Sequence, residues 1–187
     1  MSNTKASWLM VALIFGLQGN ASFAADWHSV DSGRELSFTV VFEGAEATGW
    51  FQNFAVHVKI DTEGHADSVL VTVDVPSATM NNEEIDSGMA SPEWFDSAQF
   101  PLASFGSNTV RRDGQDFIAE GVLTLKGISQ NISVPIHWEE QQEQARISGE
   151  LTLSRMDFNI GRGEWQDETV IAHSVRVRFR VLLEPDH

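Results

Sequence analysis

Phe54-Ala55-Val56-His57-Val58-Lys59-Ile60 decides the fold class, because apolar residues occupy alternate positions along it. Phe54 and Val56 would point to one side of an extended strand, and His57 and Lys59 to the other. This alternation is typical of a strand that has one face in a core and the other in water. The stretch therefore predicts a half-buried β-strand.

The same alternation recurs along most of the chain, and helices do not alternate with the strands, so a parallel sheet is disfavoured. About eight long antiparallel strands can close as a sandwich or as a barrel, and a barrel of that size is either filled by side chains or holds one small ligand. The predicted strands are 35–43, 52–60, 68–75, 102–109, 117–125, 132–139, 145–153 and 175–183.

One insertion, residues 77–99, interrupts the strand pattern. Its polar part, 82–89, is compatible with a short helix. A second helix is predicted to begin at Ser91, which can cap it, with Pro92 in the first helical position. The insertion also carries two aromatic residues, Trp94 and Phe95, and could form a lid or plug over one end of the barrel.

Residues 1–24 have the three-part layout of a secretory signal peptide. Lys5 supplies the positive start, 8–17 form a short apolar core, and Ser22-Phe23-Ala24 offers a cleavage site. A membrane anchor would need roughly 20 apolar residues. We therefore expect one exported domain, residues 25–187, located in a bacterial periplasm.

Composition excludes several classes of function. The chain has no cysteine, so disulfides, thiolate-bound zinc, iron–sulfur clusters and covalent c-type haem are ruled out. Its formal net charge of −15 disfavours nucleic acid as a partner. No two histidines are spaced at i,i+2 or i,i+4, so we expect surface histidines and no dedicated metal site.

The apolar strand faces could line the interior, or could face lipid as in an outer-membrane barrel. Charges at successive outward positions, as at Arg176, Arg178 and Arg180, are typical of a solvated outer wall. The chain has no tyrosine, and its aromatic residues do not form girdles at strand ends. We therefore expect the apolar face inside.

Five motifs, in order along the chain, resemble the YceI-like family. The segment EWFDSAQFPLASF (93–105) is the most specific of them and is similar to the family's aromatic-Phe-Asp signature. The other four are DWHSVD (26–31) with the following Ser-Phe strand, GWFQNF (49–54), GVLTLKGIS (121–129) and SRMDFNIG (154–161).

This resemblance implies a lipocalin-like, eight-stranded antiparallel barrel with a short helical insertion. It also implies that an apolar channel binds a polyisoprenoid, such as an isoprenoid quinone or a polyprenyl lipid, in the periplasm. The segment GRGEW (161–165), together with Trp94, resembles the subset found alongside b561-type cytochromes. That subset suggests a membrane cytochrome as partner, and a homodimer is a further expectation. Many members carry an Arg-Asp pair where this chain reads NEEID (82–86), so that arginine is missing here.

The ligand-binding residues that we predict fall into two groups. Inward positions of the strands would line the apolar tail, and four aromatic residues would lie near the mouth. The first group is Phe38, Val40, Phe54, Val56, Val71, Val73, Leu123 and Trp138, and the second is Trp94, Phe95, Phe158 and Trp165.

Two other functions remain open. Asp157 and Glu164 could act as a carboxylate pair in a hydrolase at the barrel rim, although Arg155 and Asp157 are better explained as a pair that ties a loop to the rim. Alternatively, the barrel could be packed full and serve as an interaction module that docks on a membrane cytochrome. We favour a binding protein without catalytic residues.

Overall fold

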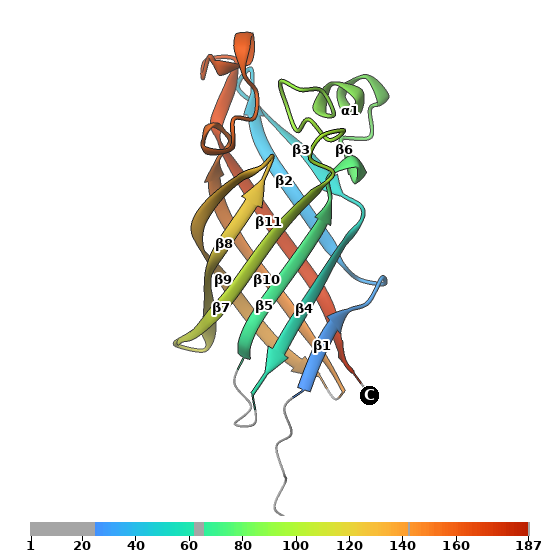
Figure 1. Ribbon diagram of the computed structural model, residues 1–187, viewed down its shortest axis with the longest axis vertical. Helices are drawn as coiled ribbons and strands as arrows, with labels where there is room; N and C mark the ends of the chain where they lie inside the picture. Colours follow the sequence, from blue (N-terminus) through green and yellow to red (C-terminus); the bar gives the residue numbers. More distant parts are fainter. Residues whose placement is uncertain (1–24, 62–65, 142, 187) are drawn as a thin grey trace, which may run out of the picture.

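The computed structural model describes residues 25–61, 66–141 and 143–186, so the expected signal peptide (1–24) lies outside the described residues. Antiparallel strands dominate and form a tall barrel (Figure 1). The strands are β1 (Ala25–Ser29), β2 (Glu35–Phe42), β3 (Ala45–Phe51), β4 (Phe54–Ile60), β5 (Ala66–Asp74), β6 (Ala78–Thr79), β7 (Leu102–Asp113), β8 (Asp116–Leu125), β9 (Ile128–Gln141), β10 (Gln144–Ser154) and β11 (Ile171–Pro185).

Eight strands close the barrel in the order β1-β4-β5-β7-β8-β9-β10-β11, and pairing of β1 with β11 completes the ring. The predicted eight-stranded antiparallel barrel is therefore confirmed. One of the eight ring strands differs from the prediction. The ring is closed by β1, which the alternation did not reveal. The predicted strand 35–43 is β2, which pairs with the other part of the long strand β11.

Strands β1 and β2 share one edge of β11 and are separated by the turn at residues 30–34 (Figure 1). Side chains bridge this break to β4. Arg34 Nη1 donates to the carbonyl of Phe54 at 2.5 Å, and Ser29 Oγ accepts from the amide of Val56 at 3.0 Å. Past the break, β2 pairs with β3, and β3 pairs with the short strand β6.

Apolar side chains line the interior, as the alternation predicts. Val56 and Val58 on β4 are only 3% and 2% exposed. Trp27 and Trp138 pack edge to face, with ring centroids 5.8 Å apart, where β1 and β9 carry the lower part of the wall. Charged side chains lie on the outer face, where Arg178 pairs with Glu150 at 2.6 Å. No helix in the described part of the chain is long and apolar enough to cross a membrane.

The predicted short helix is α1 (Glu83–Met89), and Asn82 caps it by accepting from the amides of Glu84 and Ile85. The predicted second helix at Ser91 is wrong, because residues 91–99 form consecutive turns. The amide of Phe95 donates back to the carbonyl of Met89, which reverses the chain. Asp96 then adopts a left-handed backbone with φ of 49°, which a helix does not tolerate.

Candidate functional site

A cavity of about 170 Å³ lies in the middle of the barrel. Hydrocarbon side chains from β2 and from every ring strand except β1 form its wall, and Ser104 is the one residue of the lining with a polar side chain. The lining residues are Leu36, Phe54, Val56, Val69, Val71, Val73, Ala103, Ser104, Phe105, Leu123, Leu125, Ile132, Val134, Ile136, Ile147, Leu151, Leu153, Val177, Phe179 and Val181.

The structure brings five of the twelve predicted ligand-binding residues to this cavity. They are Phe54, Val56, Val71, Val73 and Leu123. The other lining residues were not among the predicted ligand-binding residues, although the same alternation runs through the strands that carry them. The pattern could have identified these residues if the inward face of every strand had been included.

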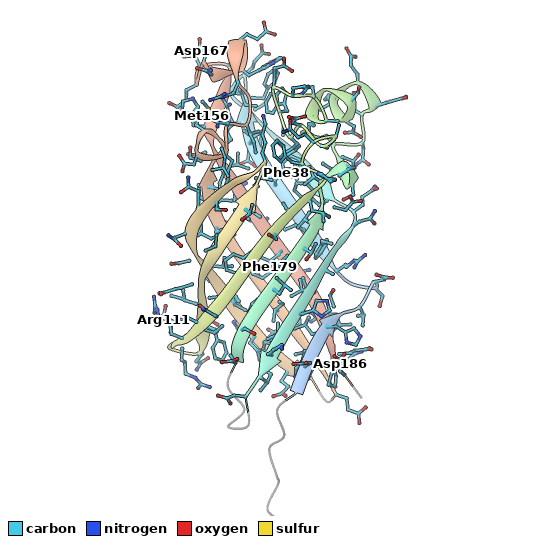
Figure 2. The ribbon with its side chains drawn as sticks, in the orientation of Figure 1. Phe38, Arg111, Met156, Asp167, Phe179 and Asp186 are labelled. Carbon is cyan, nitrogen blue, oxygen red and sulfur yellow. The ribbon has the colours of Figure 1, made fainter. Side chains whose placement is uncertain are left out.

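The other predicted residues lie towards the ends of the barrel. Phe38 and Phe95 belong to an aromatic cluster with Phe51, in which ring centroids lie 5.4 to 6.3 Å apart. Gly49 makes room for this cluster, because a Cβ there would lie 2.3 Å from Cζ of Phe38. Phe38 is labelled in Figure 2 above the cavity residue Phe179.

The remaining five residues are distributed over both ends. Trp138 packs against Trp27 at the lower end, far from the predicted mouth. Phe158 is 2% exposed and is enclosed near the upper end. Val40 is half-buried on β2 and does not line the cavity. Trp94 and Trp165 pack against each other at the upper end.

Two segments cover the upper end of the barrel, and we call them the end cover. The first is residues 75–101. The second is 155–170, which contains the 3₁₀ turns η2 (Arg155–Phe158) and η3 (Gly163–Gln166). The amides of Gly161 and Arg162 both donate to the carbonyl of Glu93, at 2.8 and 3.1 Å. Trp94 and Trp165 pack together with centroids 5.7 Å apart, so each segment supplies half of this contact.

Lys126, in the turn between β8 and β9, joins both segments of the end cover. Its Nζ donates to the carbonyls of Pro92 at 2.7 Å and Asn159 at 3.0 Å. Burial lowers the pKa of Lys126 below its ordinary value, and the nearby carboxylate of Asp96 partly opposes this shift. Its two hydrogen bonds make Lys126 a donor to both segments of the end cover.

Arg155 holds the second segment in shape. It is 3% exposed, and its guanidinium donates to five backbone carbonyls, those of Ile160, Gly161, Trp165, Ile171 and Ala172. Burial lowers its pKa, against an opposing effect of Glu168. The loop is thus tied to the rim by Arg155, as expected, but through carbonyls and not through a pair with Asp157.

The residues of the hydrolase alternative do not form a common site. Asp157 and Glu164 are both exposed, on separate turns, and Asp157 contributes its backbone carbonyl to a bond from Gln130. Among the described residues, no group of three or more His, Asp or Glu side chains is placed to hold a metal ion.

A closed antiparallel barrel with a hydrocarbon-lined cavity is a lipocalin-like barrel, the fold class that the sequence motifs imply. The family is shown directly, because residues 22–183 match the sequence model of the YceI-like domain. The chain belongs to the YceI-like family.

Relatives and solved structures agree with this membership. A UPF0312 protein of Enterobacter sp. (strain 638) is 31% identical over 121 residues, which cover 60% of this chain and 62% of that protein. Protein YceI of Escherichia coli is 29% identical over 121 residues, with the same coverage of 60% and 62%. The chain therefore spans less than two thirds of the length of these relatives.

Among solved structures, BcnA of Burkholderia cenocepacia superposes with a TM-score of 0.76 at 28% identity, over 80% of this chain and 95% of that one. A polyisoprenoid binding domain from Saccharophagus degradans superposes with a TM-score of 0.64 at 18% identity, over 87% and 99% of the two chains. The second likeness shows the fold alone.

Proposed function

We propose that this protein binds the apolar chain of an isoprenoid lipid in its central cavity and carries or sequesters it. The observation that supports this most strongly is the cavity wall, which is hydrocarbon on all sides except at Ser104. A dry pocket of this kind gains about 0.8 kcal/mol for each CH₂-sized group that leaves water. Each five-carbon isoprene unit would therefore contribute about 4 kcal/mol before the losses of binding are subtracted.

The size of the cavity limits what it holds without rearrangement. A volume of about 170 Å³ is close to that of an engineered cavity of about 150 Å³ that binds benzene. The cavity thus accommodates about one or two isoprene units. A longer chain requires the barrel to widen.

Binding is favoured over the two alternatives by specific observations. The exposed carboxylates of Asp157 and Glu164 do not converge on the cavity, which disfavours the hydrolase. The cavity itself disfavours a barrel packed full for docking alone, because well-packed cores contain few voids larger than a water molecule. The polyisoprenoid binding domain from S. degradans supports the proposal through its similar fold.

The biological setting is also part of the proposal. Export to the periplasm is inferred from the leader pattern in residues 1–24 and from the lack of cysteine. An isoprenoid quinone as ligand, and a b561-type membrane cytochrome as partner, follow from the resemblance of 161–165 with Trp94. Trp94 and Trp165 are in contact with each other at the upper end of the barrel, which is consistent with a joint role for these two elements. A homodimer remains an expectation.

The test is a titration with geranylgeraniol that carries an anthraniloyl fluorophore, whose emission rises in apolar surroundings. Val71 points into the cavity, and its neighbour Leu70 is 50% exposed on the outer face. We expect Val71→Arg to weaken binding at least 30-fold and Leu70→Arg to leave it within twofold. Equal affinity in the wild type and a folded Val71→Arg variant would place the ligand elsewhere.

A further inference from the structure

The wall between β9 and β10 is hydrogen-bonded over only part of its length. Their pairing runs from Gln141–Gln144 to His137–Ser148 and stops there. Farther up, residues 128–136 of β9 pair only with β8, and residues 149–154 of β10 pair only with β11. We call these two unpaired edges the seam.

Two residues mark the foot of the seam. Pro135 has no backbone N–H to offer to a neighbouring strand. Gly149 lies against it so closely that a Cβ would stand 2.2 Å from the carbonyl oxygen of Pro135. The two strands are still in close contact here, and above this point their ladder does not continue.

The seam differs from the other break in the wall, at residues 30–34. That break is bridged by bonds from Arg34 and to Ser29. Across the seam, the described residues 128–136 and 149–154 form no side-chain hydrogen bond with one another. One bond ties the upper part of the seam to the second segment of the end cover, where Gln130 Nε2 donates to the carbonyl of Asp157 at 3.3 Å.

The seam borders the cavity from both sides. Ile132, Val134 and Ile136 of β9 and Leu151 and Leu153 of β10 all belong to the cavity wall. A separation of the two strands would thus expose hydrocarbon side chains on both edges. A chain that enters there would contact apolar surface throughout its passage.

We propose that the lipid chain enters sideways through the seam, and that the cavity widens there to hold the part of the chain that about 170 Å³ does not accommodate. This inference rests on the proposed function. Opening the seam breaks no ladder bond, and it breaks the one side-chain bond from Gln130 to Asp157. Opening the end cover breaks the bonds to Glu93 and those from Lys126, and separates Trp94 from Trp165.

The experiment uses paired cysteines, which are unique because the chain has none of its own. Ser133→Cys with Thr152→Cys, joined by a short bis-maleimide, ties the seam, since continuing the β9–β10 register places these exposed residues opposite each other. Val122→Cys with Asn131→Cys is the matched control, because these exposed residues are directly paired across the intact β8–β9 ladder.

A third pair, Glu93→Cys with Arg162→Cys, ties the end cover instead. Uptake of anthraniloyl-geranylgeraniol is followed by stopped-flow fluorescence, and each variant is compared with its own form before cross-linking. We expect the seam cross-link to slow uptake at least tenfold, and both other cross-links to change it less than twofold. Side access is overturned if the cover cross-link slows uptake and the seam cross-link does not, or if neither the seam nor the cover cross-link slows it. Binding itself stands in both cases.

Equilibrium binding separates the two proposals, since a wild-type protein that does not bind the probe overturns the proposed function as well. Hydrogen exchange on the unmodified protein gives an independent result that needs no variant to fold. Probe binding is expected to change amide protection in 128–136 and 149–154 more than in 159–165. A change confined to 159–165 would contradict the seam.

Discussion

Replacing Arg155 by lysine tests whether one buried guanidinium shapes the rim of the barrel. The five carbonyls that Arg155 contacts lie on three parts of the chain, so this side chain joins η2, η3 and the start of β11. A lysine ammonium has three donors and no planar fork. At least two carbonyls would therefore lose their donor.

The magnitude follows from the number of bonds lost. A hydrogen bond from a charged donor contributes about 1.5–3 kcal/mol. With two bonds lost and some compensation by water at the rim, we expect the free energy of unfolding to fall by about 3 kcal/mol. For a domain of this size, that corresponds to a Tm lower by about 6–12 °C.

The assay is urea unfolding, followed by far-UV circular dichroism and tryptophan fluorescence. Arg162→Lys is the matched control, because Arg162 is exposed and makes one side-chain bond, to Asn159 Oδ1 at 2.9 Å. It should alter stability by less than about 0.5 kcal/mol. A loss of less than about 0.5 kcal/mol for Arg155→Lys, with an unchanged denaturant slope, would refute this account of the rim.

Three further predictions concern the wall, the helix and the outer surface. Gly121→Ala should destabilise the protein by about 1–3 kcal/mol in the same urea assay, because its Cβ would lie 2.3 Å from the carbonyl oxygen of Gly106, whereas Gly106→Ala meets nothing within 4 Å and should be tolerated. Asn82→Ala should cost about 1 kcal/mol, because α1 loses its cap; equal midpoints for variant and wild type would show that the cap is dispensable. The hydrogen bond to Asp116 at 2.5 Å raises the pKa of His137, so its NMR titration midpoint should lie above 6.5 and fall in Asp116→Asn. His137 therefore adds stability that is fully present below pH 6.5 and is lost as pH rises through the higher folded-state pKa; an unchanged midpoint in the variant would count against the pair.

The sequence predicted the parts of the fold that depend on long runs of alternation. β4 and β5 have clear period-2 patterns, and both were predicted with their inward faces correct. β1 is five residues long and β3 is mostly small or polar, so neither carries enough pattern to be recognised. The closing strand of the barrel was missed for that reason.

Other features depend on contacts between distant parts of the chain. Ser91 and Pro92 are good local signals for a helix, but burial of Phe95 in the cluster with Phe38 favours turns instead. Alternation tells which residues face inward and not how much space they leave, so the volume of the cavity could not be predicted. The carbonyls around Arg155 are likewise brought together only by the folded loop.

The central claim is that the cavity holds an isoprenoid chain, and mass spectrometry of an organic extract tests it most directly. The protein is purified from a quinone-producing bacterium with export intact, beside the Val71→Arg and Leu70→Arg variants. We predict a stoichiometric prenyl quinone or polyprenyl species in the extracts of wild type and Leu70→Arg, and its loss from Val71→Arg. A clean extract from folded wild-type protein that also fails to bind added geranylgeraniol would contradict the claim.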